Sequence, residues 1–163
     1  MAKTSTNTHY INNQEFLAAL VEHRDRVQLA RAENKPTPAV SNYIGDCFIK
    51  IARHLSYKSN FINYSYRDEM ISDGIENCIS YLDNFNPEKS TNPFAYFTQI
   101  IYFAFLRRIQ KERKHLYIKQ KTLLNFAFEG MLVEGQEDFD SNFQGKIDLD
   151  NDYMSNLVKD FET

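Results

Sequence analysis

Apolar residues recur at helical spacing in four stretches of the chain, and turn-forming residues separate these stretches. The first three predicted helices cover residues 14–32, 40–57 and 66–84. Pro36 and Pro38 end the first helix, because a proline lacks the amide hydrogen that a continuing helix needs. Pro93 suits the first turn of a long fourth helix, whose periodicity weakens after about Leu124. The pattern therefore predicts an all-α fold.

Each of the first three helices has one apolar stripe, which predicts its buried face. The stripes are Phe16, Leu17, Leu20, Val27 and Ala30 in the first helix, Ile44, Cys47 or Phe48, Ile51 and Leu55 in the second, and Met70, Ile71, Ile75, Cys78, Ile79 and Leu82 in the third. Asn12 or Asn13 is suited to cap the first helix. The opposite side of the third helix carries Asp68, Glu69, Asp73 and Glu76.

The fourth helix carries apolar and aromatic groups on two sides rather than one. One side has Phe94, Thr98, Ile101, Phe105 and Ile109, and the other has Phe97, Ile100, Ala104, Arg107, Arg108 and Lys111. The first side is predicted to pack on the second and third helices. The second side changes from aromatic to cationic, and from Arg107 to Lys121 seven Lys and Arg accompany one acid, Glu112.

Two interpretations of this second side are open. Cations neutralise phosphates with release of counterions, and flat aromatic rings stack on unpaired bases, so the side is suited to a strand leaving a duplex. Alternatively, the helix is buried all round and its basic end complements the helix dipole. Seven cations exceed what dipole compensation needs, which favours nucleic acid.

The charge of the chain is divided between a basic body and an acidic tail. Residues 1–128 hold 17 Lys and Arg against 12 Asp and Glu, whereas residues 129–163 hold 2 against 10. Such a division indicates two different partners, one of them polyanionic. With 163 residues, the chain is expected to hold one compact domain with tails. The predicted segments are an N-terminal helix and linker (1–36), a helical domain (37–125), a flexible acidic linker (126–150) and a partner-binding tail (151–163).

Other classes of site find little support in the sequence. Cys47 and Cys78 lack a CxxC motif or an adjacent His and are expected to be small core residues. The four histidines are scattered, so no metal is expected, and the absence of a nucleophile elbow, a P-loop or a dinucleotide fingerprint predicts no cofactor and no enzyme. Without an apolar run long enough to cross a bilayer, or a signal peptide, the expected location is the cytoplasm.

The order of motifs in the third and fourth helices resembles region 2 of bacterial RNA polymerase sigma factors. YRDEMISDGIENCISYLDNF is followed by a turn and by NPFAYFTQIIYFAFLRRI. The chain is most similar to the late-promoter sigma factors of T-even-type bacteriophages, whose IADGIE, NPxAY and RIKKERK-like segments correspond to ISDGIE, NPFAY and RIQKERK here. The resemblance covers roughly residues 10–121 and is strongest over 66–115. It implies a compact region 2-like domain.

The resemblance implies a protein that binds host core RNA polymerase and directs it to an AT-rich late-promoter element at about minus ten. Phe97 matches the aromatic that stacks on a flipped adenine, and Ile100 and Ile101 stand where principal sigma factors have paired Trp. Ala104 replaces a polar residue that reads the edge of the element. The implied DNA-binding residues are Phe94, Tyr96, Phe97, Ile100, Ile101, Ala104, Arg107, Arg108, Lys111, Arg113 and Lys114. Contact is expected mainly with the non-template strand.

Two protein partners are also implied. Glu69, Ser72, Asp73 and Glu76 lie where sigma factors contact the clamp helices of the largest polymerase subunit, although Ser72 replaces a common Gln. Leu157, Val158 and Phe161 have the hydrophobic and acidic setting of the segment that engages the DNA sliding clamp, although their spacing differs from that of the family. A phage co-activator is a further candidate partner, and no membrane is expected.

The alternative is a regulator that grips polymerase or a host sigma factor without touching promoter DNA. An ordinary helix-turn-helix repressor is less well supported, because the chain lacks a compact recognition helix after a short Gly-containing turn.

Overall fold

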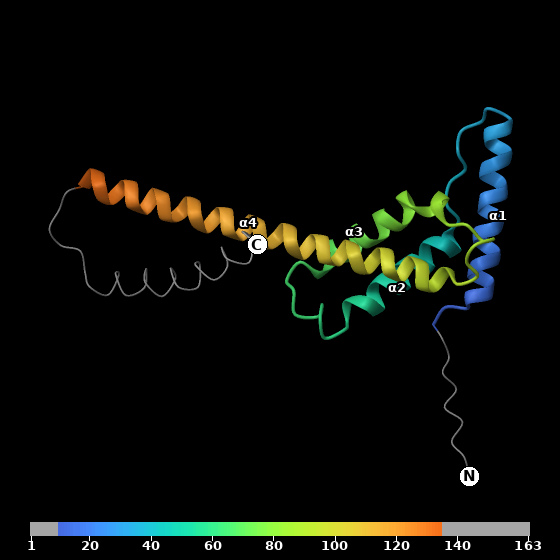
Figure 1. Cartoon of the computed structure of the whole chain (residues 1–163), viewed down its shortest axis with the longest axis horizontal. Coiled ribbons are helices and arrows are strands. Elements are labelled where there is room, and N and C mark those ends of the chain that lie inside the picture. Colours follow the sequence, from blue (N-terminus) through green and yellow to red (C-terminus); the bar gives the residue numbers. More distant parts are fainter. Residues whose placement is uncertain (1–9, 135–163) are drawn as a thin grey trace, which may run out of the picture. The chain divides into compact units, whose positions relative to one another are not determined.

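A computed structural model describes residues 10–134 of the chain (Figure 1). These residues form four α-helices, α1 (Asn13–Ala32), α2 (Asn42–Ser56), α3 (Arg67–Ser80) and α4 (Pro93–Glu134), with a short 3₁₀ helix η1 (Leu82–Asn84), and the described part contains no strand. The all-α prediction is confirmed. The chain divides into two compact units, residues 1–108 and 109–163.

Helix boundaries follow the capping residues of the sequence. The Asn12 side chain accepts hydrogen bonds from the amides of Gln14 and Glu15, which satisfies amides at the start of α1 that have no partner within the helix. Ser41 caps α2 through a hydrogen bond from the Ile44 amide. At α4, Pro93 follows Asn92, whose side chain accepts from the Ala95 amide.

Two predicted boundaries differ from the structure. The third predicted helix ran to residue 84, but α3 ends at Ser80 and the 3₁₀ helix covers the remainder. α4 continues to Glu134, past the linker predicted to begin at residue 126. No proline interrupts α4 after its first residue, so weak apolar periodicity alone does not end the helix.

The core of the first unit is an aromatic cluster centred on Phe97. Its ring centroid lies 4.8 Å from that of Phe48 on α2, 5.7 Å from Phe16 on α1 and 5.8 Å from Phe85, which follows η1. All four side chains are buried. Offset and tilted ring pairs at these distances add to the free energy gained from burial. Phe97 therefore joins three of the elements that surround α4.

Gly74 allows α3 and α4 to lie close together. A Cβ atom placed on this glycine would stand 3.0 Å from Cγ2 of Ile101 and 3.3 Å from Cε1 of Phe105. Both of these α4 side chains are buried, as are Met70 and Cys78 on α3. The glycine of the ISDGIE motif thus has a packing role in this structure.

Most of the predicted core residues are buried, with one clear exception, and the structure also buries residues that the apolar pattern did not identify. Ile79, assigned to the buried face of α3, is 50% exposed, because α3 turns its Met70, Gly74 and Cys78 side inward. His23 and Ser56 are polar residues buried in the described part that the apolar pattern did not identify. Both cysteines are buried as expected, and burial raises the pKa of the Cys78 thiol to about 12.

Candidate nucleic-acid and polymerase interface

Three residues assigned to promoter DNA lie in the core. Phe97 and Ile101 have no exposed surface, and Ala104 has 2%. A buried ring has no free face for a base, and a buried isoleucine cannot prop open a duplex fork. The predicted DNA contacts of Phe97, Ile101 and Ala104 are therefore wrong for this structure.

The physical reason is that α4 is enclosed on more than one side. Phe97 contacts Phe16 and Phe48, while Phe105 lies 5.2 Å from the Phe61 ring in an edge-to-face arrangement. The two apolar sides predicted for this helix thus merge into one broad buried face. The side predicted to face solvent therefore continues this buried face through Phe97 and Ala104, whereas its Arg107 and Lys111 are exposed.

Phe94, Tyr96 and Ile100 are half-buried. The Phe94 ring lies 5.7 Å from Tyr10 in an edge-to-face arrangement, and Tyr96 lies 5.2 Å from Phe85. Burial raises the pKa of Tyr96. All three side chains are partly open to a ligand, and those of Phe94 and Tyr96 pack against neighbouring rings.

Within residues 93–108 of α4, the exposed aromatic surface consists of Tyr102 and Phe103. These residues are 37% and 48% exposed, and their rings lie 5.9 Å apart, edge to face. The Tyr102 ring also packs edge to face on the buried Phe61 ring, with 5.6 Å between the centroids. They were not assigned to the site from sequence. The sequence feature that indicates their exposure is the polar residue Gln99, which is exposed and lies on the same side of the helix.

The cations of α4 fall into two groups by their partners. Arg108 donates two hydrogen bonds to the Asp73 carboxylate, of 2.6 Å from Nε and 2.7 Å from Nη2, and both side chains are largely buried. Arg107 donates to the Asn77 side chain at 2.9 Å. A bidentate pair of this kind fixes geometry more than a single contact does. Arg108 is thus committed to holding α3, whereas Arg107 keeps an exposed side chain.

In the second unit, the predicted phosphate-binding residues Lys111, Arg113 and Lys114 are exposed. Lys119 and Lys121 are exposed as well. The Lys121 ammonium group lies 5.7 Å from the centroid of the Tyr117 ring and donates a 3.4 Å hydrogen bond to the Tyr117 hydroxyl. The cationic segment is accessible along this part of α4.

The predicted polymerase-binding face of α3 is exposed at three of its four positions. Glu69, Ser72 and Glu76 lie on the solvent side of the helix, and exposed Ile79 continues the same side. Asp73 is the exception, because its carboxylate pairs with Arg108. The acid therefore stabilises the α3–α4 packing rather than belonging to the open face.

Leu157, Val158 and Phe161, assigned to the sliding clamp, lie outside the described residues. Within residues 10–134, no group of three or more His, Cys, Asp or Glu side chains is placed to hold a metal ion. None of the helices described is both long and apolar enough to cross a bilayer. No protein-family model matches the sequence, and no curated protein matches it significantly.

Proposed function

We propose that the protein is a phage sigma factor that binds host core RNA polymerase and directs it to an AT-rich minus-ten-like element of late promoters. The observation that carries this proposal is the exposed acidic face of α3, made by Glu69, Ser72 and Glu76. It occupies the motif that resembles the polymerase-binding helix of sigma factors. The Asp73–Arg108 pair holds this helix against α4 and so presents the face in a fixed orientation.

Charge complementarity is the expected basis of polymerase binding. Glu69 and Glu76 lie on one side of α3, two turns apart, where they can meet basic helices of the polymerase clamp. Such pairing accelerates encounter and sets the orientation of the complex more than it adds affinity. The exposed Ile79 provides an apolar contact at the end of the same face.

Promoter contact is assigned to the exposed groups of α4. Tyr102 and Phe103 offer ring surface to unpaired bases, and stacking of this kind contributes about 1–3 kcal/mol per base. Arg107, Lys111, Arg113 and Lys114 are accessible for phosphates. Base stacking and phosphate binding need different residues. Aromatic rings stack only on unpaired bases, whereas cations bind the phosphates of any strand.

Sliding-clamp binding by Leu157, Val158 and Phe161 remains part of the proposal, on the strength of the resemblance. Truncation after Asp150 is expected to abolish stimulation of transcription by the clamp and to leave basal initiation unchanged. Equal stimulation of the truncated and full-length chains would refute this assignment.

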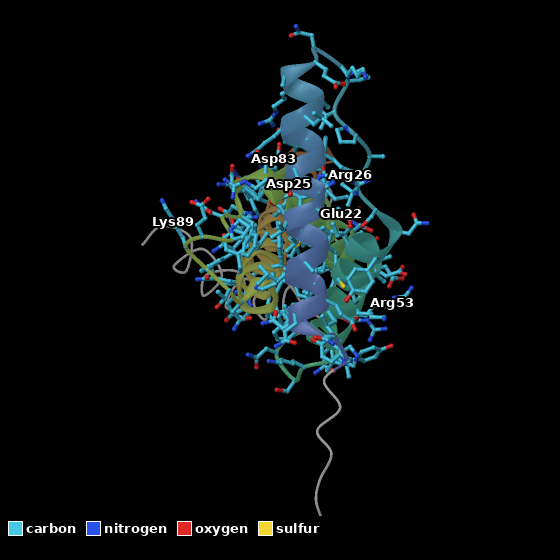
Figure 2. All side chains as sticks on the ribbon, turned by 90° about the vertical axis from the view of Figure 1, so that its right-hand side faces the viewer. Glu22, Asp25, Arg26, Arg53, Asp83 and Lys89 are labelled. Atoms are coloured by element: carbon cyan, nitrogen blue, oxygen red, sulfur yellow. The ribbon has the colours of Figure 1, made fainter. Side chains whose placement is uncertain are left out.

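The first test is co-purification of the full chain with bacterial core RNA polymerase, followed by run-off transcription from a TATAAATA-like template. The double variant Glu69→Lys and Glu76→Lys is expected to lose polymerase binding. The matched control is Glu22→Lys with Asp25→Lys, which makes the same charge change at exposed positions of α1, labelled in Figure 2. Equal co-purification of the two double variants would exclude the α3 face as the docking site.

The second candidate function is a polymerase-binding regulator that does not contact promoter DNA. The burial of Phe97, Ile101 and Ala104 favours it, because these residues were to stack on and separate the strands. The two candidates differ in run-off transcription from purified core polymerase. A sigma factor supports it alone, whereas a regulator binds polymerase and yields no transcript.

A further inference from the structure

A cavity of about 180 Å³ lies between α1 and the segment around η1. Its polar lining comes from His23, Arg24, Gln28 and Arg31 on α1 and from Asp83 on η1, and apolar side chains of the same elements complete it. One water molecule takes about 30 Å³, so the space admits about six waters or one small polyatomic ion with part of its hydration shell. The cavity is separate from both faces discussed above.

His23 is the unusual residue of this cavity. It is 4% exposed, and its Nδ1 atom has no hydrogen-bond partner among the described residues. Buried polar atoms are almost always hydrogen-bonded, because desolvation without a partner is costly. A ligand that hydrogen-bonds to the imidazole would remove this cost.

The charges around the cavity indicate the sign of that ligand. Arg24 donates a 3.3 Å hydrogen bond to the Asn86 side chain, which leaves the charge of its guanidinium uncompensated by any acid at that contact. Arg31 pairs with Asp83 at 2.7 Å, and Asp83 is the one acid in the lining of this cavity. With two guanidinium groups against one carboxylate, the lining favours an anion.

We propose that this cavity binds a single phosphate-type oxyanion, held by the Arg24 guanidinium, the Gln28 amide and the imidazole of His23. The oxyanion has acceptors for all three donors, and guanidinium bonds to such groups are short and strong. The proposal does not depend on the sigma-factor function. The anion is either free in solution or the phosphate of a nucleic-acid strand.

Anion binding is coupled to protonation of His23. Burial, and to a lesser extent Arg26, lowers the pKa of His23 in the free protein, while Asp83 opposes this. The charges that act on His23 are those of Arg26 on α1 and Asp83 on η1, and Arg24 and Arg31 line the same cavity. A bound anion adds a negative charge, so it raises the pKa of His23 again. Affinity therefore falls as pH rises through the pKa of the complex.

The test uses sulfate as the probe, because sulfate does not titrate between pH 5 and 8. NMR of the His23 imidazole in the full-length protein should show a raised pKa on addition of sulfate. Arg24→Gln should weaken sulfate binding by roughly tenfold, as expected for a lost hydrogen bond to a charged group. The control Arg53→Gln removes the same charge at an exposed position of α2, outside the cavity lining, and should weaken sulfate binding far less.

An unchanged His23 pKa at saturating sulfate, or equal weakening of sulfate binding by Arg24→Gln and Arg53→Gln, would overturn the proposal. A second arm adds a single-stranded oligonucleotide. Competition with sulfate at His23 identifies a strand phosphate as the ligand, whereas retention of the sulfate signal identifies a free anion.

Discussion

Residues 93–108 and 109–129 of α4 belong to one helix but differ in what they bury. In the first part, Phe97, Ile101 and Phe105 are fully buried, and only Tyr102 and Phe103 among the rings are substantially exposed. In the second part, Phe126 and Phe128 are 68% and 65% exposed, and the cations are exposed as well. Aromatic content alone therefore does not identify a binding surface, since similar residues form core in one part and surface in the other.

The largest expected effect separates the core rings from the surface rings. Phe97→Ala should reduce the free energy of unfolding by about 3–5 kcal/mol, because it empties the centre of the aromatic cluster. Phe103→Ala, at a 48% exposed position, should change it by less than about 1 kcal/mol. Urea denaturation of both variants measures the difference. Similar losses in the free energy of unfolding would contradict the burial of Phe97 and the exposure of Phe103.

The next effect concerns the close approach of α3 to the first part of α4. Gly74→Ala should destabilise the fold by about 1–3 kcal/mol, because the new methyl group meets Ile101 and Phe105. Gly45→Ala on α2 is the matched control: nothing lies within 4 Å of the added Cβ, and alanine favours a helix by about 0.8–1.0 kcal/mol over glycine. The midpoint of thermal unfolding should fall for Gly74→Ala and rise for Gly45→Ala. A stabilising Gly74→Ala would contradict the packing.

A smaller effect is expected from the pair that joins these helices. Asp73→Asn should cost about 1–2 kcal/mol, because Arg108 then keeps at most one hydrogen bond, to a neutral oxygen, at a largely buried site. Glu22→Gln is the control, since its 4.0 Å contact with Arg26 is exposed and such pairs contribute little. Chemical denaturation of the two variants decides whether Asp73 stabilises the fold. Equal free energies of unfolding for the two variants would mean that the Asp73–Arg108 pair does not stabilise the fold.

The smallest effect on stability is expected in the second part of α4. Lys111→Gln with Lys114→Gln should leave the free energy of unfolding within about 0.5 kcal/mol of the parent, because both side chains are exposed. The salt dependence of single-strand binding should become shallower by about 0.7 per lost phosphate contact. Binding measured at several salt concentrations tests this. An unchanged slope would show that these cations do not contact phosphates.

How far the sequence predicts this structure depends on the helix. The spacing of apolar residues locates α1 and α2 closely, and Asn12, Ser41 and Pro93 stand at helix starts as capping rules require. Which side chains of α4 are buried is not predictable in the same way. A helical wheel shows which residues share a side, but Phe97 and Phe103 are chemically alike, and only the positions of α1, α2 and Phe85 decide which ring is enclosed.

The candidate site shows the same limit. Glu69, Ser72 and Glu76 are exposed as the motif led us to expect, because acids on a helix rarely face an apolar core. The sequence assigns Asp73 to polymerase and Arg108 to DNA. In the structure the two side chains pair with each other across 35 positions of the sequence. A pairing between two helices depends on their packing, which residue spacing within either helix does not contain.

The most direct test of the account is promoter opening by the double variant Tyr102→Ala and Phe103→Ala, bound to core RNA polymerase on a TATAAATA-like template. Val21→Ala with Leu29→Ala, which removes exposed apolar side chains from α1, is the control. The account predicts that both variants co-purify with polymerase and that only the α4 variant loses permanganate-reactive, opened promoter DNA. Unimpaired opening by the α4 variant would contradict the assignment of the exposed rings to the unpaired strand.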